Sequence, residues 1–153
     1  MKITKRLEFD YGHRVPSHKS KCRSPHGHRG ALEVTLEGSI QSVRGESDDG
    51  MVLDFSDIKL IAKQEVGDKW DHAFLVYKGD EVMRACLEAG ECLGWRIVVL
   101  SCIPTAENLA NVAFETLYNA YKSKYGDRLE LKKVRFYETP NSWAEVTCLV
   151  KVS

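Results

Sequence analysis

Hydrophobic and polar side chains alternate along the first segment of the chain. The odd positions from Ile3 to Tyr11 are apolar except for Lys5, and the even positions between them are polar. A second alternation runs from Leu32 to Ile40. Successive side chains of a strand point to opposite faces of a sheet, so this period of two predicts two half-buried strands.

The spacing of apolar residues changes to three and four in two later segments. Residues 54–70 follow this period, and a carboxylate or hydroxyl at their start can cap the helix that it predicts. Residues 104–126 predict a second long helix, which a proline opens and a glycine ends. Between them, residues 80–93 favour a short helix and residues 96–102 a short buried strand or loop.

Two further alternating runs, residues 129–139 and 143–152, predict strands joined by a turn over residues 140–142. Strands that are close in sequence tend to pair antiparallel. The order ββααββ therefore predicts an α+β domain, with a four-stranded antiparallel sheet and two long helices on one face. The other face stays uncovered, and an uncovered apolar face favours assembly with other copies of the chain.

The composition fits a single domain over residues 1–153. At 43% hydrophobic and 29% charged residues, the chain can build a core and is not of the disordered class. Basic and acidic residues number 22 each, which argues against a chain-wide grip on nucleic acid.

The sequence favours the cytoplasm. The longest apolar run covers only residues 73–77, too short for a membrane-spanning helix, and the N-terminal segment lacks a hydrophobic signal core. Five cysteines without a Cys-x-x-Cys pair favour reduced thiols over disulfides. We expect the four that follow Cys22 to fill the core.

Three of the five histidines are predicted to converge. His13 continues the apolar face of the first strand, and His26 and His28 share the parity of Leu32 on the second, provided that no bulge at Gly30 resets it. The end of one strand meets the start of the next in an antiparallel pair. Three imidazoles there would form an open Zn²⁺ site with a fourth position for water or substrate. The alternative is an ordinary His-Gly-His turn beside a core histidine.

Cys22 precedes His26 by four residues on the same loop. A thiolate beside a divalent cation can act as a base or nucleophile. The alternatives are a fourth metal ligand and an inert loop cysteine.

The segment from Tyr11 to Leu32 contains no acidic residue. A local positive cluster here would suit an anionic small substrate such as a polyphosphate, and the alternative is a solvated basic loop. Its basic residues are Arg14, His18, Lys19, Lys21, Arg23 and Arg29.

Three carboxylates are further candidates for the site. Asp71 can orient His72 as a proton relay if the backbone turns between them, and otherwise the two form a surface pair. Glu138 shares its strand face with apolar residues, so it needs an internal partner or a ligand with two adjacent N–H donors. Glu107 lies in the first turn of the second long helix, where its charge also complements the helix dipole.

These motifs together resemble the 6-pyruvoyl-tetrahydropterin synthase family. Residues 22–28, Cys-Arg-Ser-Pro-His-Gly-His, preceded by residues 9–13, Phe-Asp-Tyr-Gly-His, are similar to its zinc motif. The resemblance extends through almost the whole chain, over segments 50–55, 71–72, 104–110 and 137–139.

The resemblance implies a tunnelling fold (T-fold) assembled into a ring, typically a hexamer made of two trimers, with active sites at subunit interfaces. It implies Zn²⁺ on His13, His26 and His28. It also implies that Cys22 is the proton-abstracting base.

The same resemblance implies that Asp71 and His72 form a second acid/base pair reaching the site from a neighbouring subunit. Glu138 would grip N3–H and the 2-amino group of a pterin, with Thr105 and Glu107 lining the pocket.

The Cys-x-x-x-His-Gly-His spacing is similar to that of family members with a carboxy product, because pyruvoyl synthases usually carry two more residues there. The implied reaction is zinc-dependent conversion of 7,8-dihydroneopterin triphosphate to 6-carboxy-5,6,7,8-tetrahydropterin, acetaldehyde and triphosphate. The alternatives are triphosphate elimination alone, giving a 6-pyruvoyl product, and a zinc- and pterin-binding protein without catalysis. Residues 73–103 are longer than in compact members, and their role stays open.

Overall fold

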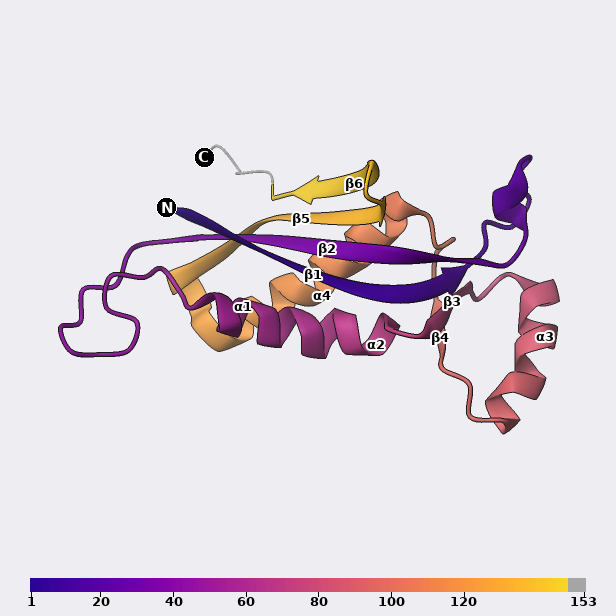
Figure 1. Ribbon diagram of the computed structural model, residues 1–153, viewed down its shortest axis with the longest axis horizontal. Helices are drawn as coiled ribbons and strands as arrows, with labels where there is room; N and C mark the ends of the chain where they lie inside the picture. The colour runs from indigo at the N-terminus through magenta and orange to yellow at the C-terminus, as the bar shows by residue number, and fades with distance from the viewer. Residues whose placement is uncertain (149–153) are drawn as a thin grey trace.

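A six-stranded sheet forms the body of the protein in the computed structural model, which describes residues 1–148 (Figure 1). The strand order is β4-β3-β1-β2-β5-β6. The strand bounds are β1 Lys2–His13, β2 His26–Gly38, β3 Ala73–Tyr77, β4 Ile97–Leu100, β5 Leu129–Thr139 and β6 Ser142–Thr147.

The alternating segments pair as predicted. β1 and β2 form a long antiparallel ladder from Lys2 opposite Glu37 to His13 opposite His26, without a bulge at Gly30. β5 pairs antiparallel with β2 and with β6. β2 ends at Gly38, so Ile40 lies outside the predicted strand.

The two long helices lie on one face of the sheet (Figure 1). The first begins as α1, Phe55–Ala62, with Asp54 capping the amide of Ser56, and continues through a π turn, Lys63–Gly67, into α2, Asp68–Trp70. The second, α4, runs over Ala106–Tyr125 and ends at Gly126, which has a positive φ.

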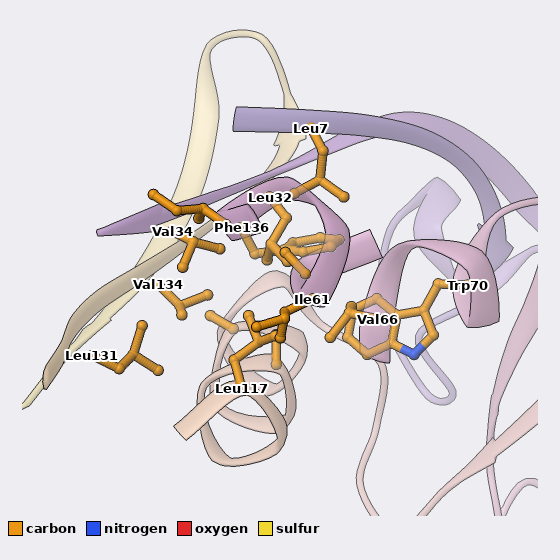
Figure 2. Close-up of a cluster of buried hydrophobic side chains, with 14 of the residues drawn as sticks. Leu7, Leu32, Val34, Ile61, Val66, Trp70, Leu117, Leu131, Val134 and Phe136 are labelled. Atoms are coloured by element: carbon orange, nitrogen blue, oxygen red, sulfur yellow. The ribbon is translucent and has the colours of Figure 1, made fainter. Parts of the chain in front are cut away.

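The core lies between these helices and the sheet. Figure 2 shows side chains from both layers meeting, with Phe136 of β5 and Ile61 of the first helix among them. The predicted stripe on α4 is confirmed by its buried residues, which are Leu109, Ala110, Ala113, Leu117 and Tyr121. On the first helix the predicted face is wrong at one position, because Phe55 in the first turn is 50% exposed.

The sheet has six strands instead of the four predicted, and it is mixed. β3 and β4 extend it beyond β1, and both new pairings are parallel. Residues 73–77 are continuously apolar because a strand inside a parallel array is buried on both faces, and such a strand does not alternate. The short helix predicted over 80–93 is α3, Glu81–Cys92, which projects away from the sheet (Figure 1).

Three smaller expectations also differ from the structure. Cys86 and Cys92 are exposed on α3 and do not fill the core. The last predicted strand ends at Thr147, and residues 149–152 of the prediction lie outside the described part. The face of the sheet opposite the helices is not an apolar surface, because it carries ion pairs such as Arg135 with Glu145. None of the helices described is both long enough and apolar enough to cross a membrane.

Candidate functional site

Three imidazoles meet where β1 ends and β2 begins. The register puts His13 opposite His26 and Tyr11 opposite His28. The ring centroids lie 4.6 Å apart for His13 and His26, 5.1 Å for His13 and His28, and 4.9 Å for His26 and His28. One ring nitrogen of each lies within 4.8 Å of the other two. The predicted convergence of the three histidines is therefore confirmed.

Hydrogen bonds determine which ring nitrogens are free. Nδ1 of His13 donates to the carbonyl oxygen of Pro104 at 2.6 Å, and Nδ1 of His26 donates to that of Ser24 at 2.8 Å. A backbone carbonyl only accepts, so the proton of each neutral ring is on Nδ1 and the Nε2 lone pair is free.

The unprotonated ring nitrogens are suitable ligands for a metal cation. Nε2 of His13 and Nε2 of His28 are buried and have no hydrogen-bond partner among residues 1–148. Burial is the main cause that lowers the pKa of His13 and of His28, which favours the neutral rings that bind metals. Three neutral imidazoles are a ligand set for Zn²⁺ that leaves one position open.

Glu138 borders this cluster from β5. Its Oε1 lies 3.6 Å from Nε2 of His13 and 3.8 Å from Nε2 of His28, and its side chain is 29% exposed. Val134 and Phe136, on the same strand face, are buried as predicted. No arginine pairs with Glu138 among the described residues, so this partly buried carboxylate is available to a ligand.

The start of α4 packs against the imidazole cluster through Pro104. Thr105 caps α4, accepting a hydrogen bond from the amide of Asn108 at 3.4 Å. Glu107 is exposed in the first turn. The structure shows helix-end positions for both residues, and their predicted role in lining a pterin pocket stays a prediction.

Cys22 lies in a 3₁₀ turn, Lys21–Arg23, on the loop between β1 and β2. Its carbonyl oxygen accepts a 2.8 Å hydrogen bond from the amide of Val15, and the residue is partly buried. The thiol is outside the group of nitrogens that the three imidazoles form. Its predicted role as a base is not tested by this geometry.

Asp71 and His72 form a second group with Asp10. Oδ1 of Asp71 accepts from the amide of Asp10 at 3.0 Å, and the amide of His72 donates to the carbonyl of Asp10 at 2.7 Å. His72 has a φ of 54°, so the backbone turns at this residue, and the role of Asp71 and His72 as a relay stays a prediction. Because Asp10 and His13 are three positions apart on one strand, their side chains face opposite sides of the sheet. Within one chain, Asp10, Asp71 and His72 form a group of possible ligand atoms separate from that of the three imidazoles.

The predicted basic cluster is smaller than the sequence indicates. Arg14 forms a bidentate ion pair with the buried carboxylate of Asp80, with Nε 2.6 Å from Oδ2 and Nη2 2.8 Å from Oδ1. Arg29 pairs with Glu8 and Asp10. These acidic partners lie outside residues 11–32, so the composition of that segment alone does not show them.

A hollow of about 550 Å³ is lined by residues from both groups, although His13 and His28 do not border it. His26 borders it from the imidazole cluster, and Asp10 and His72 border it from the second group. Trp95 and Arg96, which follow α3, complete one wall. Sequence reasoning did not single out Trp95 or Arg96, because only the parallel pairing of β3 and β4 brings their segment beside β1. Asp10 was not singled out because it is one of several polar residues on the polar face of β1.

The fold and the site together define an α+β domain of the T-fold class with a cluster of three histidines that could hold a metal ion. The family model described as 6-pyruvoyl tetrahydropterin synthase matches residues 2–148, and the chain belongs to that family.

Named relatives cover nearly the whole chain. A 6-carboxy-5,6,7,8-tetrahydropterin synthase of Rickettsia felis is 35% identical over 150 residues, covering 95% of this chain and 99% of the relative. A protein of the same name from Haemophilus influenzae is 31% identical, covering 94% and 96%.

Solved structures confirm the fold. An uncharacterized protein of Wolinella succinogenes superposes with a TM-score of 0.80 at 26% identity, covering 97% of this chain and 98% of the other. The 6-pyruvoyl tetrahydropterin synthase of Caenorhabditis elegans superposes with a TM-score of 0.62 at 23% identity, covering 96% and 94%.

Proposed function

We propose that the protein is a zinc-dependent lyase. Its reaction converts 7,8-dihydroneopterin triphosphate and one water to 6-carboxy-5,6,7,8-tetrahydropterin, acetaldehyde and triphosphate. The observation that carries the proposal is the cluster of three imidazoles beside Glu138, with buried, unpaired nitrogens on His13 and His28. Membership of the family and the names of the relatives favour this chemistry and the carboxy product.

His13, His26 and His28 would hold the zinc ion. When bound, Zn²⁺ supplies Lewis acidity that polarises the side-chain hydroxyls of the substrate and acidifies the neighbouring C–H. Glu138 binds the pterin, because its carboxylate accepts from N3–H and from the 2-amino group at once.

Cys22 removes the acidified proton, and His72, oriented by Asp71, moves protons on the other side of the substrate. We further propose that the Asp71–His72 pair comes from a neighbouring subunit of a homo-oligomer, a hexamer of two trimers. Its support is the separation of the pair from the imidazole cluster within one chain. The described cysteines are all free, which is consistent with work in the reducing cytoplasm.

A product assay tests the proposal. Zinc-loaded protein is incubated with 7,8-dihydroneopterin triphosphate, and both acetaldehyde and the mass of the pterin are followed. Acetaldehyde with 6-carboxy-tetrahydropterin in equal amounts supports the proposal. A 6-pyruvoyl product without acetaldehyde contradicts the carbon–carbon cleavage step, and no turnover by the zinc-loaded protein contradicts the lyase activity.

A further inference from the structure

The Tyr11 side chain lies inside the metal site, although the reaction proposed above gives it no role. It is 3% exposed and stands opposite His28 in the β1–β2 pair. The centroid of its ring lies 5.2 Å from that of His13, 5.8 Å from that of His28 and 5.5 Å from that of Phe136. The Tyr11 ring is therefore packed between two of the proposed metal ligands, His13 and His28, and β5, the strand that carries Glu138.

Gly30 on β2 leaves room for the Tyr11 ring, because it has no side chain. A Cβ atom on Gly30 would lie 2.8 Å from Cε1 of Tyr11 and 3.3 Å from the carbonyl oxygen of Tyr137. The phenol ring therefore crosses β2 over Gly30, toward the strand that holds Glu138. A larger residue at position 30 would displace the ring.

The Tyr11 hydroxyl is a donor without an acceptor. It is buried, and it has no hydrogen-bond partner within residues 1–148. A buried unpaired hydroxyl is costly, and the one on Tyr11 lies beside a carboxylate-bearing strand that could supply an acceptor.

The Glu138 carboxylate is an acceptor without a hydrogen-bond donor among the described residues. In the described structure its Oε1 faces Nε2 of His13 and Nε2 of His28 at distances too long for hydrogen bonds. Nε2 of His13 carries a lone pair, because its ring proton is on Nδ1. A carboxylate that faces a lone pair is stable only with a cation between them or with a donor elsewhere.

We propose that Tyr11 is a positioning residue whose hydroxyl donates a hydrogen bond to the Glu138 carboxylate when the metal occupies the imidazoles. The bond turns the carboxylate away from the histidines and aims its free oxygen at the ring N–H groups of the pterin. The inference rests on the proposed function, because it takes the pterin as the ligand of Glu138.

The first test compares Tyr11→Phe with Tyr125→Phe. Tyr125 is a matched control, because its hydroxyl is also buried without a partner and its ring lies against Tyr121, outside the metal site. Binding of 7,8-dihydroneopterin to the zinc-loaded protein is measured by calorimetry, and KM by the product assay. Loss of a hydrogen bond to a charged group predicts that Kd and KM rise about tenfold in Tyr11→Phe. Neither constant changes in Tyr125→Phe, and neither variant lowers the melting temperature.

A double-mutant cycle adds a readout that a purely structural role would not move. In a Glu138→Gln background, Tyr11→Phe changes Kd much less than it does in the wild type, because the two side chains act as a unit. Wild-type binding by Tyr11→Phe, or independent and additive effects in the cycle, would overturn the inference.

A crystal structure of the zinc-loaded protein without substrate separates this inference from the proposed function. A hydrogen bond between the Tyr11 hydroxyl and a Glu138 oxygen supports the inference even if the protein fails the product assay, which would then contradict the proposed function alone. A Glu138 carboxylate that does not contact the Tyr11 hydroxyl in this crystal overturns the inference, whatever the activity.

Discussion

His13 and Pro104 are joined by a 2.6 Å hydrogen bond, although 91 positions separate them in the chain. Pro104 immediately precedes Thr105, the residue that caps α4. The orientation of the His13 ring therefore depends on how α4 packs against the sheet. A histidine proposed as a metal ligand on a strand is thus oriented by a helix that begins in the second half of the sequence.

His26 gives the simplest test of the metal site, because it is partly exposed and its loss leaves the core intact. We expect His26→Ala to weaken zinc binding by at least about 100-fold, since a direct ligand contributes more than the outer partners of a ligand do. Zinc content after dialysis, measured by atomic absorption, checks this. His18→Ala is the control, because His18 is exposed and bonds only to Ser20 among described residues. Full zinc retention in His26→Ala would refute the three-histidine site.

Cys22→Ala should keep zinc and fold while losing most turnover. General acid–base catalysis contributes roughly 10²–10⁴ in rate, and kcat should fall by a factor in that range. The control is Cys86→Ala, which removes an exposed thiol on α3. If Cys22→Ala instead loses zinc, the thiol is a fourth ligand, and if it retains full activity, Cys22 is not the base.

Mixing two inactive variants tests whether sites are shared between subunits. Cys22→Ala and His72→Ala chains, dissociated and reassembled together at equal amounts, should recover about a quarter of wild-type activity, because a random pair of neighbours then supplies both intact residues that often. Each variant alone stays inactive. Mixed oligomers, verified by native mass spectrometry, that show no activity would place Asp71 and His72 in the site of their own subunit.

The Arg14–Asp80 pair should stabilise the fold more than the exposed pairs do. The side chain of Asp80 is 3% exposed, and it also accepts from the amide of Met83 at the start of α3. Asp80→Ala leaves the guanidinium of Arg14 unpaired, and we expect a loss of about 3 kcal/mol in the free energy of unfolding. Arg29→Ala breaks an exposed pair and should cost less than about 1 kcal/mol. Urea unfolding of both variants measures the difference, and equal losses would contradict it.

The alternation of side chains along the first two strands was enough to predict that the three histidines meet. His26 and His28 keep the parity of Leu32, and the β1–β2 register confirms that they meet His13. β3 could not be predicted from alternation, because residues 73–77 are apolar on both faces of the strand. The partner of Arg14 could not be predicted either, because Asp80 is 66 positions away, and only the tertiary fold brings the two together.

Tyr11 shows another limit of reasoning from pattern. Tyr11 lies on the apolar face of its strand, as Phe9 does, so the pattern alone cannot distinguish it from an ordinary core aromatic residue. The structure shows the difference, because Tyr11 carries a buried hydroxyl without a hydrogen-bond partner among the described residues. The sequence signal that was available is the pair of Tyr11 with Gly30, a large ring and a glycine on neighbouring strands.

The parallel strand β3 has a consequence for hydrogen exchange. It pairs with β1 over residues 11–13 alone, so the segment that ends in His13 is bonded to β2 on one side and to β3 on the other. Amides there should exchange with solvent only when much of the sheet opens, whereas α3 buries only Leu87 and Gly90 and should exchange early. His13, the proposed metal ligand on β1, is thus expected to lie in the slowest-opening part of the molecule. Apart from Asp80, α3 could fluctuate or vary in sequence without displacing it.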